Sequence, residues 1–208
     1  IVALLFGKDN YGRVKGNNIF RMLQLQAKSF IKEEKLLLLS LRTIVCHVPF
    51  VAFVLFWQIY ATEVIHIETK YLAFFLLVFM VLLMLGNYAV SIFTRKISNL
   101  GTSIAGIIIS ILGFVLLFVL PSFPGFVMGA GLIEFGFGVE QSATSTWMCD
   151  CIESETRSAY SSIQSVAGFI IMNLLGVLTE WNGVNAAWCV AAVAMGVDIV
   201  ILVIFSRK

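Results

Sequence analysis

The sequence predicts an all-α membrane protein with six transmembrane helices. Of its 208 residues, 60% are hydrophobic and only 12% are charged, and the mean hydropathy is +0.97. A soluble domain is usually about a quarter charged, so this chain has too few ionic groups to cover a surface that faces water. The composition argues against a soluble enzyme, a disordered chain and a nucleic-acid-binding protein, and it favours a protein that crosses the membrane several times.

Six apolar runs have the length of roughly 20 residues that a helix needs to cross the hydrocarbon layer. Continuous runs favour helices, because a helix satisfies its own backbone hydrogen bonds in lipid. The expected spans are Leu36–Tyr60, Tyr71–Thr94, Leu100–Pro121, Pro124–Cys149, Ser158–Glu180 and Val184–Phe205. A short apolar segment, Ile1–Gly7, is expected to be the end of a preceding span.

The basic residues predict the orientation of the spans. Of the 14 Lys and Arg residues, twelve fall on one side of the predicted layer, Lys70 alone falls on the other, and Arg42 lies inside a span. Because Lys and Arg accumulate in cytoplasmic loops, both ends of this chain are expected in the cytoplasm. We expect a multi-pass protein of the cell membrane.

The longest connection, Lys8–Lys35, precedes the six-helix domain at residues 36–208. Its second part, Asn18–Ile31, has apolar residues at helical spacing with basic and amide residues between them. This pattern predicts an amphipathic helix on the cytoplasmic membrane face. A linker helix packed on the bundle would show the same pattern, and the sequence does not separate these interpretations.

Two local motifs stand out in the chain. The first is a glycine-rich span containing Gly129 to Gly138, followed by Asp150 and then by Arg157 at the start of the next span. The second runs from Gly86 through Thr94 and Arg95 to Gly101. With these motifs and the six-span layout, the chain resembles the C-terminal half of a major facilitator superfamily transporter, although Thr94 stands where that family usually has an aspartate.

The resemblance implies two inverted three-helix repeats and secondary active transport by alternating access, with the solute near the membrane midplane. It implies that the first helix of each repeat, Leu36–Tyr60 and Pro124–Cys149, lines the pathway. Leu100–Pro121 has only hydroxyls as polar side chains and is expected to face lipid. The implied partners are a small solute, H⁺, the lipid bilayer and a missing N-terminal six-helix half. No cofactor, metal or nucleic acid is expected.

Glu134 is the leading candidate for the substrate or proton pathway. An ionisable side chain near mid-membrane is costly, so it is expected to face protein or water. Gly138, Gln141 and Ser145 project within roughly 40° of Glu134 on a helix, which forms one polar stripe. The function expected of Glu134 is proton or cation coupling, and a neutral acid bonded to a neighbouring helix is the structural alternative. Glu140 points to another face and is a second candidate.

Three residues of the first span are further pathway candidates: His47, Trp57 and Gln58. His47 belongs to the residue type that titrates near neutral pH, although a lone membrane histidine often only bonds a neighbouring helix. Trp57 would stack on a solute or anchor the helix at the membrane interface. Arg42 is interpreted mainly as a membrane anchor, since a long basic side chain near a helix end can reach the interface.

Asp198, in the last span, is expected either to face the bundle and pair with a polar partner or to lie near the pathway. Asp150, Arg157 and Arg95 are candidates for a cytoplasmic gate. Glycines from Gly125 to Gly138 are expected to let helices approach closely. No enzyme motif is present. The competing functional hypothesis is a membrane sensor or scaffold that keeps this fold without transporting.

Overall fold

The computed structural model describes residues 34–151 and 154–206, and every regular element in these ranges is a helix. The elements are α3 (Glu34–Ile59), η1 (Tyr60–Val64), η2 (Thr69–Tyr71), α4 (Leu72–Phe93), α5 (Asn99–Val119), α6 (Phe123–Cys151), α7 (Ser154–Asn182) and α8 (Val184–Ser206). The predicted all-α class is therefore confirmed. Ile1–Gly7 and the expected amphipathic helix Asn18–Ile31 lie outside the described residues.

Five segments in the described part of the chain are long and apolar enough to cross a membrane, which indicates an integral protein with several spans. They are Leu41–Val64, Thr69–Phe93, Asn99–Val119, Ser165–Asn182 and Val184–Ser206. The one remaining long helix in the described residues, α6, is not among them. It contains Glu134, Glu140 and many glycines, and these residues lower its hydropathy. A helix of this polarity is suited to a position where other helices cover it.

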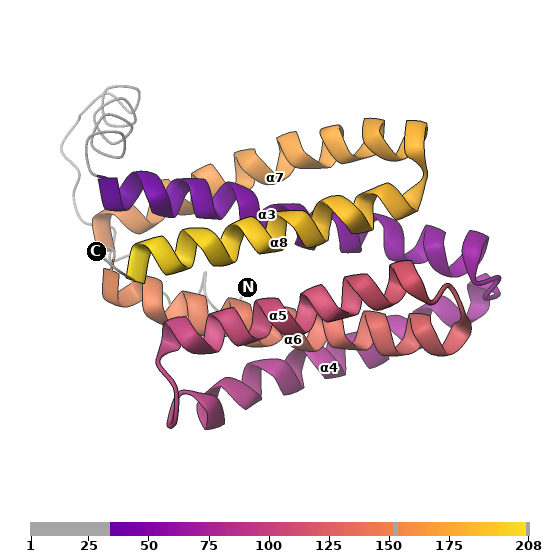
Figure 1. Cartoon of the computed structure of the whole chain (residues 1–208), viewed down its shortest axis with the longest axis horizontal. Coiled ribbons are helices and arrows are strands. Elements are labelled where there is room, and N and C mark those ends of the chain that lie inside the picture. Colours follow the sequence, from indigo (N-terminus) through magenta and orange to yellow (C-terminus); the bar gives the residue numbers. More distant parts are fainter. Residues whose placement is uncertain (1–33, 152–153, 207–208) are drawn as a thin grey trace, which may run out of the picture.

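The helices lie roughly side by side and form two groups (Figure 1). In one group α3 packs on α7 and α8, and in the other α6 packs on α4 and α5. The contact between α5 and α8 joins the two groups. Each group combines helices from the first three and the last three of the bundle.

Glycines make the interfaces of α6 close. A Cβ added at Gly136 would lie 2.7 Å from the carbonyl oxygen of Gly106 on α5, and one at Gly138 would lie 2.9 Å from the backbone nitrogen of Asn87 on α4. A Cβ at Gly129 would lie 2.9 Å from the carbonyl oxygen of Gly113. The predicted close approach through small residues is confirmed at these positions.

The expectation that Leu100–Pro121 faces lipid is wrong for one face of α5, which is buried, while another face is apolar and exposed at Ile108, Leu112 and Val115. Among the five candidate spans, the one in α5 has the largest buried share, and its small and hydroxyl residues pack between α6 and α8. Thr102, Ser103 and Ser110 are all buried. A span with only hydroxyls as polar groups can therefore pack inside the bundle, because a hydroxyl can hydrogen-bond to neighbouring helices, as Ser110 does to the carbonyl oxygen of Ile133 (3.3 Å).

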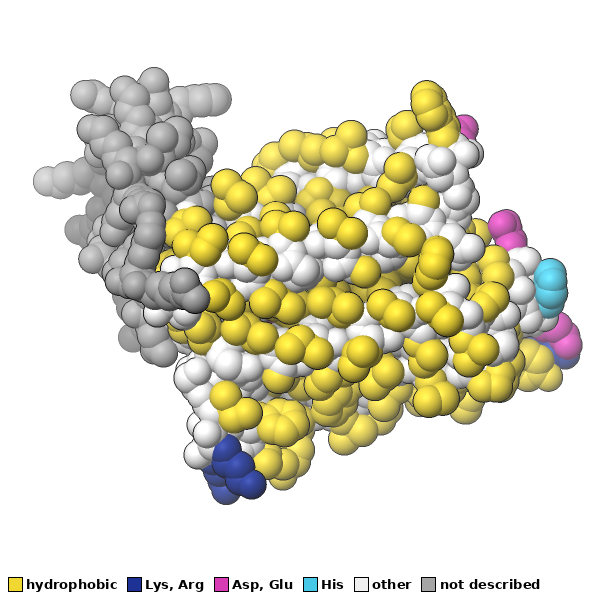
Figure 2. Space-filling view, viewed as in Figure 1, with side chains coloured by type: hydrophobic (Ala, Val, Ile, Leu, Met, Phe, Trp, Pro, Cys, Tyr) yellow, Lys and Arg dark blue, Asp and Glu magenta, His cyan; other side chains and the backbone are white. Residues whose placement is uncertain are grey.

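Charged side chains gather at two ends of an otherwise apolar flank (Figure 2). Arg95 and Lys96 are exposed in the turn between α4 and α5, and this end is called the basic end. Glu63, His66 and Glu68 are exposed at the opposite end, called the acidic end, where Lys70 pairs with Glu68 at 2.6 Å.

The core toward the acidic end is an aromatic cluster. Phe53 on α3 contacts rings from four other helices, and Tyr60 donates a hydrogen bond of 2.6 Å to the carbonyl oxygen of Leu117. The members of the aromatic cluster are Phe53, Trp57, Tyr60, Phe75, Phe79, Phe114, Phe126, Phe137 and Trp188. Edge-on and tilted ring pairs of this kind contribute beyond the area that they bury.

Candidate functional site

A buried ionic cluster joins three helices in the half of the bundle toward the basic end. Arg42 on α3 is 1% exposed, and its Nη2 atom lies 2.5 Å from Oε1 of Glu140 on α6. Its Nε atom lies 3.1 Å from Oδ1 of Asp198 on α8, which is 2% exposed. Asp198 lies eight residues before Ser206 at the end of α8, or about 12 Å along the helix.

Two hydroxyl groups also contact Arg42, and we call the set Arg42, Ser103, Glu140, Thr144 and Asp198 the Arg42 cluster. Nη2 of Arg42 donates to Oγ1 of Thr144 at 2.9 Å and approaches Oγ of Ser103 at 3.4 Å. The Thr144 hydroxyl lies 2.7 Å from Oε1 of Glu140 and 2.9 Å from the Ser103 hydroxyl.

The ring of Trp147, one turn along α6 from Thr144, lies 5.9 Å from the guanidinium carbon of Arg42. A cation this close to an aromatic face is attracted by the ring. The cluster thus surrounds one cation with two carboxylates, two hydroxyls and an aromatic face. Replacement of one member of such a buried pair is costly, because the remaining charge is left in a medium that solvates it poorly.

The interpretation of Arg42 as a membrane anchor is therefore wrong: its side chain points into the bundle. Asp198 does face the bundle and pair with a polar partner, which was one of its two expected placements. The missed signal lies in the sequence. Arg42 is the only basic residue inside a predicted span, while Glu140 and Asp198 lie inside two others, and charges in the membrane usually pair.

Glu134 is placed differently from Glu140, although the two residues share α6. It is 7% exposed, and within the described residues its carboxyl makes no hydrogen bond or ion pair. It lies one turn from Gly131 and from Gly138, both of which approach α4. The structure therefore places an unpaired acid beside the α4–α6 interface, about the middle of a 29-residue helix.

The polar stripe predicted on α6 is covered at Glu134 and open further along. Gln141 and Ser145 are exposed on the surface of this six-helix bundle, whereas Gly138 is buried against α4. Gln141 also lines a small cavity of about 20 Å³ beside the Arg42 cluster, together with Glu140 and Asp198.

The candidates on α3 are not brought together. His47 is half-buried, with Nδ1 at 3.2 Å from the carbonyl oxygen of Thr43, and it lines an apolar groove of about 270 Å³ between α3 and α7. Trp57 is only 5% exposed and packs on Phe79, with ring centroids 5.4 Å apart, so it belongs to the aromatic cluster. Gln58 is exposed.

The expected cytoplasmic gate falls mostly beyond what the structure describes. The side chains of Asp150 and Arg157 lie outside the described residues. Arg95 is exposed at the basic end.

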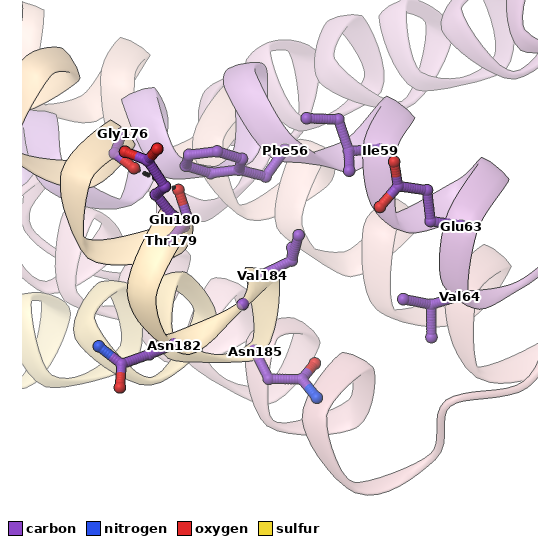
Figure 3. Close-up of a pocket in the computed structure, with 11 residues that line it drawn as sticks. Phe56, Ile59, Glu63, Val64, Gly176, Thr179, Glu180, Asn182, Val184 and Asn185 are labelled. Carbon is purple, nitrogen blue, oxygen red and sulfur yellow. Dashed lines mark hydrogen bonds between the residues drawn. The ribbon is translucent and has the colours of Figure 1, made fainter.

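A larger cavity, of about 880 Å³, opens at the acidic end between α3, η1 and the turn from α7 to α8. Glu63 and Glu180 lie on opposite sides of it, and Phe56, Ile59 and Val184 form apolar parts of its wall (Figure 3). Thr179 is turned back to its own helix, where it donates to the carbonyl oxygen of Gly176 at 2.9 Å. Sequence reasoning did not identify this cavity, because its wall combines residues far apart in the chain.

No protein-family model matches this chain, and no curated protein is significantly similar to it.

Proposed function

We propose that this chain is one half of a secondary active transporter that moves a small solute by alternating access, with the fold of the C-terminal half of a major facilitator superfamily protein. The observation that carries the proposal is the pattern of helix contacts. The five most extensive interfaces are α5 with α6, α4 with α6, α3 with α8, α5 with α8 and α3 with α7.

This set of interfaces has an internal symmetry. If α3, α4 and α5 are exchanged with α6, α7 and α8, the same five pairs are obtained. Three-helix repeats that enter the membrane from opposite sides are expected to pack in this way, because an odd number of spans inverts the second repeat. The pattern therefore supports two inverted repeats and a total of six spans, of which α6 is one.

The polar groups on α6 support a pathway along this helix. Glu134 is an acid with no partner in the described residues, while Gln141 and Ser145 are exposed just beyond the largely buried stretch 129–140 of the same helix. An amide that faces lipid would be unfavourable, so these side chains suit a surface shared with water and a second half. In this proposal Glu134 binds and releases the coupling proton when the α4–α6 surface opens to the pathway.

The distribution of charge supports an orientation with the basic end in the cytoplasm of the cell. Arg95 and Lys96 are exposed there, and Glu63 and Glu68 are exposed at the opposite end. Asp150, Arg157 and Arg95 would then form the cytoplasmic gate.

Transport by the full-length protein in proteoliposomes tests this function. A panel of solutes is added with and without an imposed pH gradient, and proton movement is followed with a pH-sensitive dye inside the vesicles. We expect at least one solute to move protons with wild type, and Glu134→Gln to abolish that movement. The exposed residue Gln58 provides the control. Gln58→Glu adds an acid on α3, and we expect proton movement still to depend on Glu134 in this variant.

If Glu134→Gln retains gradient-driven transport, Glu134 is not the coupling residue. If no solute moves protons or accumulates under any condition, the sensor or scaffold hypothesis replaces transport.

A further inference from the structure

The Arg42 cluster contains one positive and two negative groups. Arg42 balances one carboxylate, so a second ionised carboxylate would leave a net negative charge among residues that are 1%, 12% and 2% exposed. An uncompensated charge in such a place is strongly unfavourable. A bound proton on one of the two acids removes it.

The geometry distinguishes the two acids. Oε1 of Glu140 receives the closest contact from Arg42 and lies 2.7 Å from the Thr144 hydroxyl, so two donors contact this carboxyl. Oδ1 of Asp198 lies 3.1 Å from Nε of Arg42 but accepts no hydrogen bond in the described part of the structure. Asp198 is thus the acid that is less well supported as an anion.

A path for a proton leads to Asp198. The cavity of about 20 Å³ beside the cluster is lined by Asp198, Glu140 and Gln141, and also by Cys46 and apolar side chains. A cavity of this size is sufficient for one water molecule, which needs polar partners such as these. Gln141 lines this cavity and is also exposed at the surface of the bundle, so it lies between the surface and a carboxyl that is 2% exposed.

Among the described side chains, the charged and titratable groups that face Asp198 come from α3 and α6. From α3 these are Arg42 and the thiol of Cys46, and from α6 it is Glu140. The nearby residues of α5, Ser103 and Ile107, carry no charge. The one charged residue of α7 whose side chain is described, Glu180, lines the cavity at the acidic end instead.

We propose that Asp198 is a proton-binding site: its carboxyl carries a proton while Arg42 and Glu140 form the ion pair, and the proton enters and leaves through the small cavity beside Gln141. The step is a simple protonation, in which a carboxylate and H⁺ give a carboxylic acid. The site is distinct from Glu134 and goes beyond the proposed transport function, because it requires no solute and acts on the stability of the bundle.

Thermal unfolding of the full-length protein in detergent, measured from acid to alkaline pH, tests this site. Asn has the shape of a neutral Asp, so Asp198→Asn is expected to unfold within about 2 °C of wild type at neutral pH. Glu140→Gln removes the ionised partner of Arg42, and its unfolding temperature is expected to fall by about 5 °C or more.

The pH dependence gives the second measurement. The folded protein holds a proton that the unfolded chain releases at neutral pH, so wild type should lose stability as the pH rises and Asp198 deprotonates. Asp198→Asn should lose the part of this dependence that Asp198 contributes and keep any part that comes from Glu134, while the surface variant Glu68→Gln should keep all of it. The proposal is overturned if Asp198→Asn is as unstable as Glu140→Gln, if it fails to fold, or if it retains the full pH dependence. None of these measurements depends on transport, so they can succeed or fail independently of the proposed function.

Discussion

The two halves of this bundle are held together by different chemistry. Toward the basic end, one arginine with two acids and two hydroxyls connects α3, α5, α6 and α8. Toward the acidic end, aromatic rings on five helices fill the core. An ionic cluster needs particular partners at particular distances, whereas packed rings need mainly volume and shape. The first half should therefore be sensitive to the identity of single residues, and the second should tolerate conservative exchange.

Arg42→Met should destabilise the protein more than any other variant proposed for this comparison. It leaves Glu140 ionised without its cation inside the bundle, and we expect a loss of about 3–5 kcal/mol in the free energy of unfolding. Chemical or thermal unfolding of the full-length protein in detergent measures this loss.

The control is the double variant Arg42→Met with Glu140→Met. It removes both members of the ion pair and should recover most of the lost stability, because apolar replacement of a whole pair is often neutral. If the double variant is less stable than Arg42→Met alone, the loss does not arise from an unbalanced charge.

Gly136→Ala tests the interface that both halves share. An added Cβ would meet the backbone of Gly106 and Ser110 on α5, so the two helices must separate, and we expect a loss of about 1–3 kcal/mol. Gly176→Ala is the matched control on α7, where an added Cβ meets nothing within 4 Å, and it should not destabilise the protein. Equal losses in the two variants would refute the close packing of α5 on α6.

Phe53→Leu should cause the smallest loss of stability in this comparison. The exchange keeps an apolar side chain in the aromatic cluster but removes the ring contacts of Phe53, so we expect a loss of about 1–2 kcal/mol. Unfolding of this variant beside Arg42→Met compares the two halves directly. A loss as large as that of Arg42→Met would mean that the aromatic half is as strictly specified as the ionic half.

Much of the fold can be predicted from the sequence, because the length and apolarity of each helix depend on consecutive residues. The five expected spans outside α6 agree with apolar helices of the structure, and the glycines of α6 do meet other backbones. The polarity of α6 is also visible in the sequence, because Glu134 and Glu140 lie within this helix. The same two residues lower its hydropathy below that of the other spans.

The partners of the polar side chains could not be predicted in this way. Helical periodicity shows which residues share a face of one helix, but not which faces of two helices meet. Arg42 and Glu140 are separated by 98 residues, and their contact depends on how α3 and α6 cross. Trp57 illustrates the same limit, because its burial against Phe79 depends on the position of α4.

The accessibility of position 141 tests the central claim, alternating access along α6, most directly. In the full-length protein the four cysteines of this chain (Cys46, Cys149, Cys151 and Cys189) and any cysteine outside it are replaced by serine. Gln141→Cys is then labelled in sealed vesicles by a membrane-impermeant thiol reagent. Val193→Cys is the control, because Val193 is 68% exposed on an apolar face of α8 that should meet lipid. Alternating access predicts that Gln141→Cys is labelled from each side of the membrane and Val193→Cys from neither. Labelling of Gln141→Cys from one side only, or from neither, would contradict it.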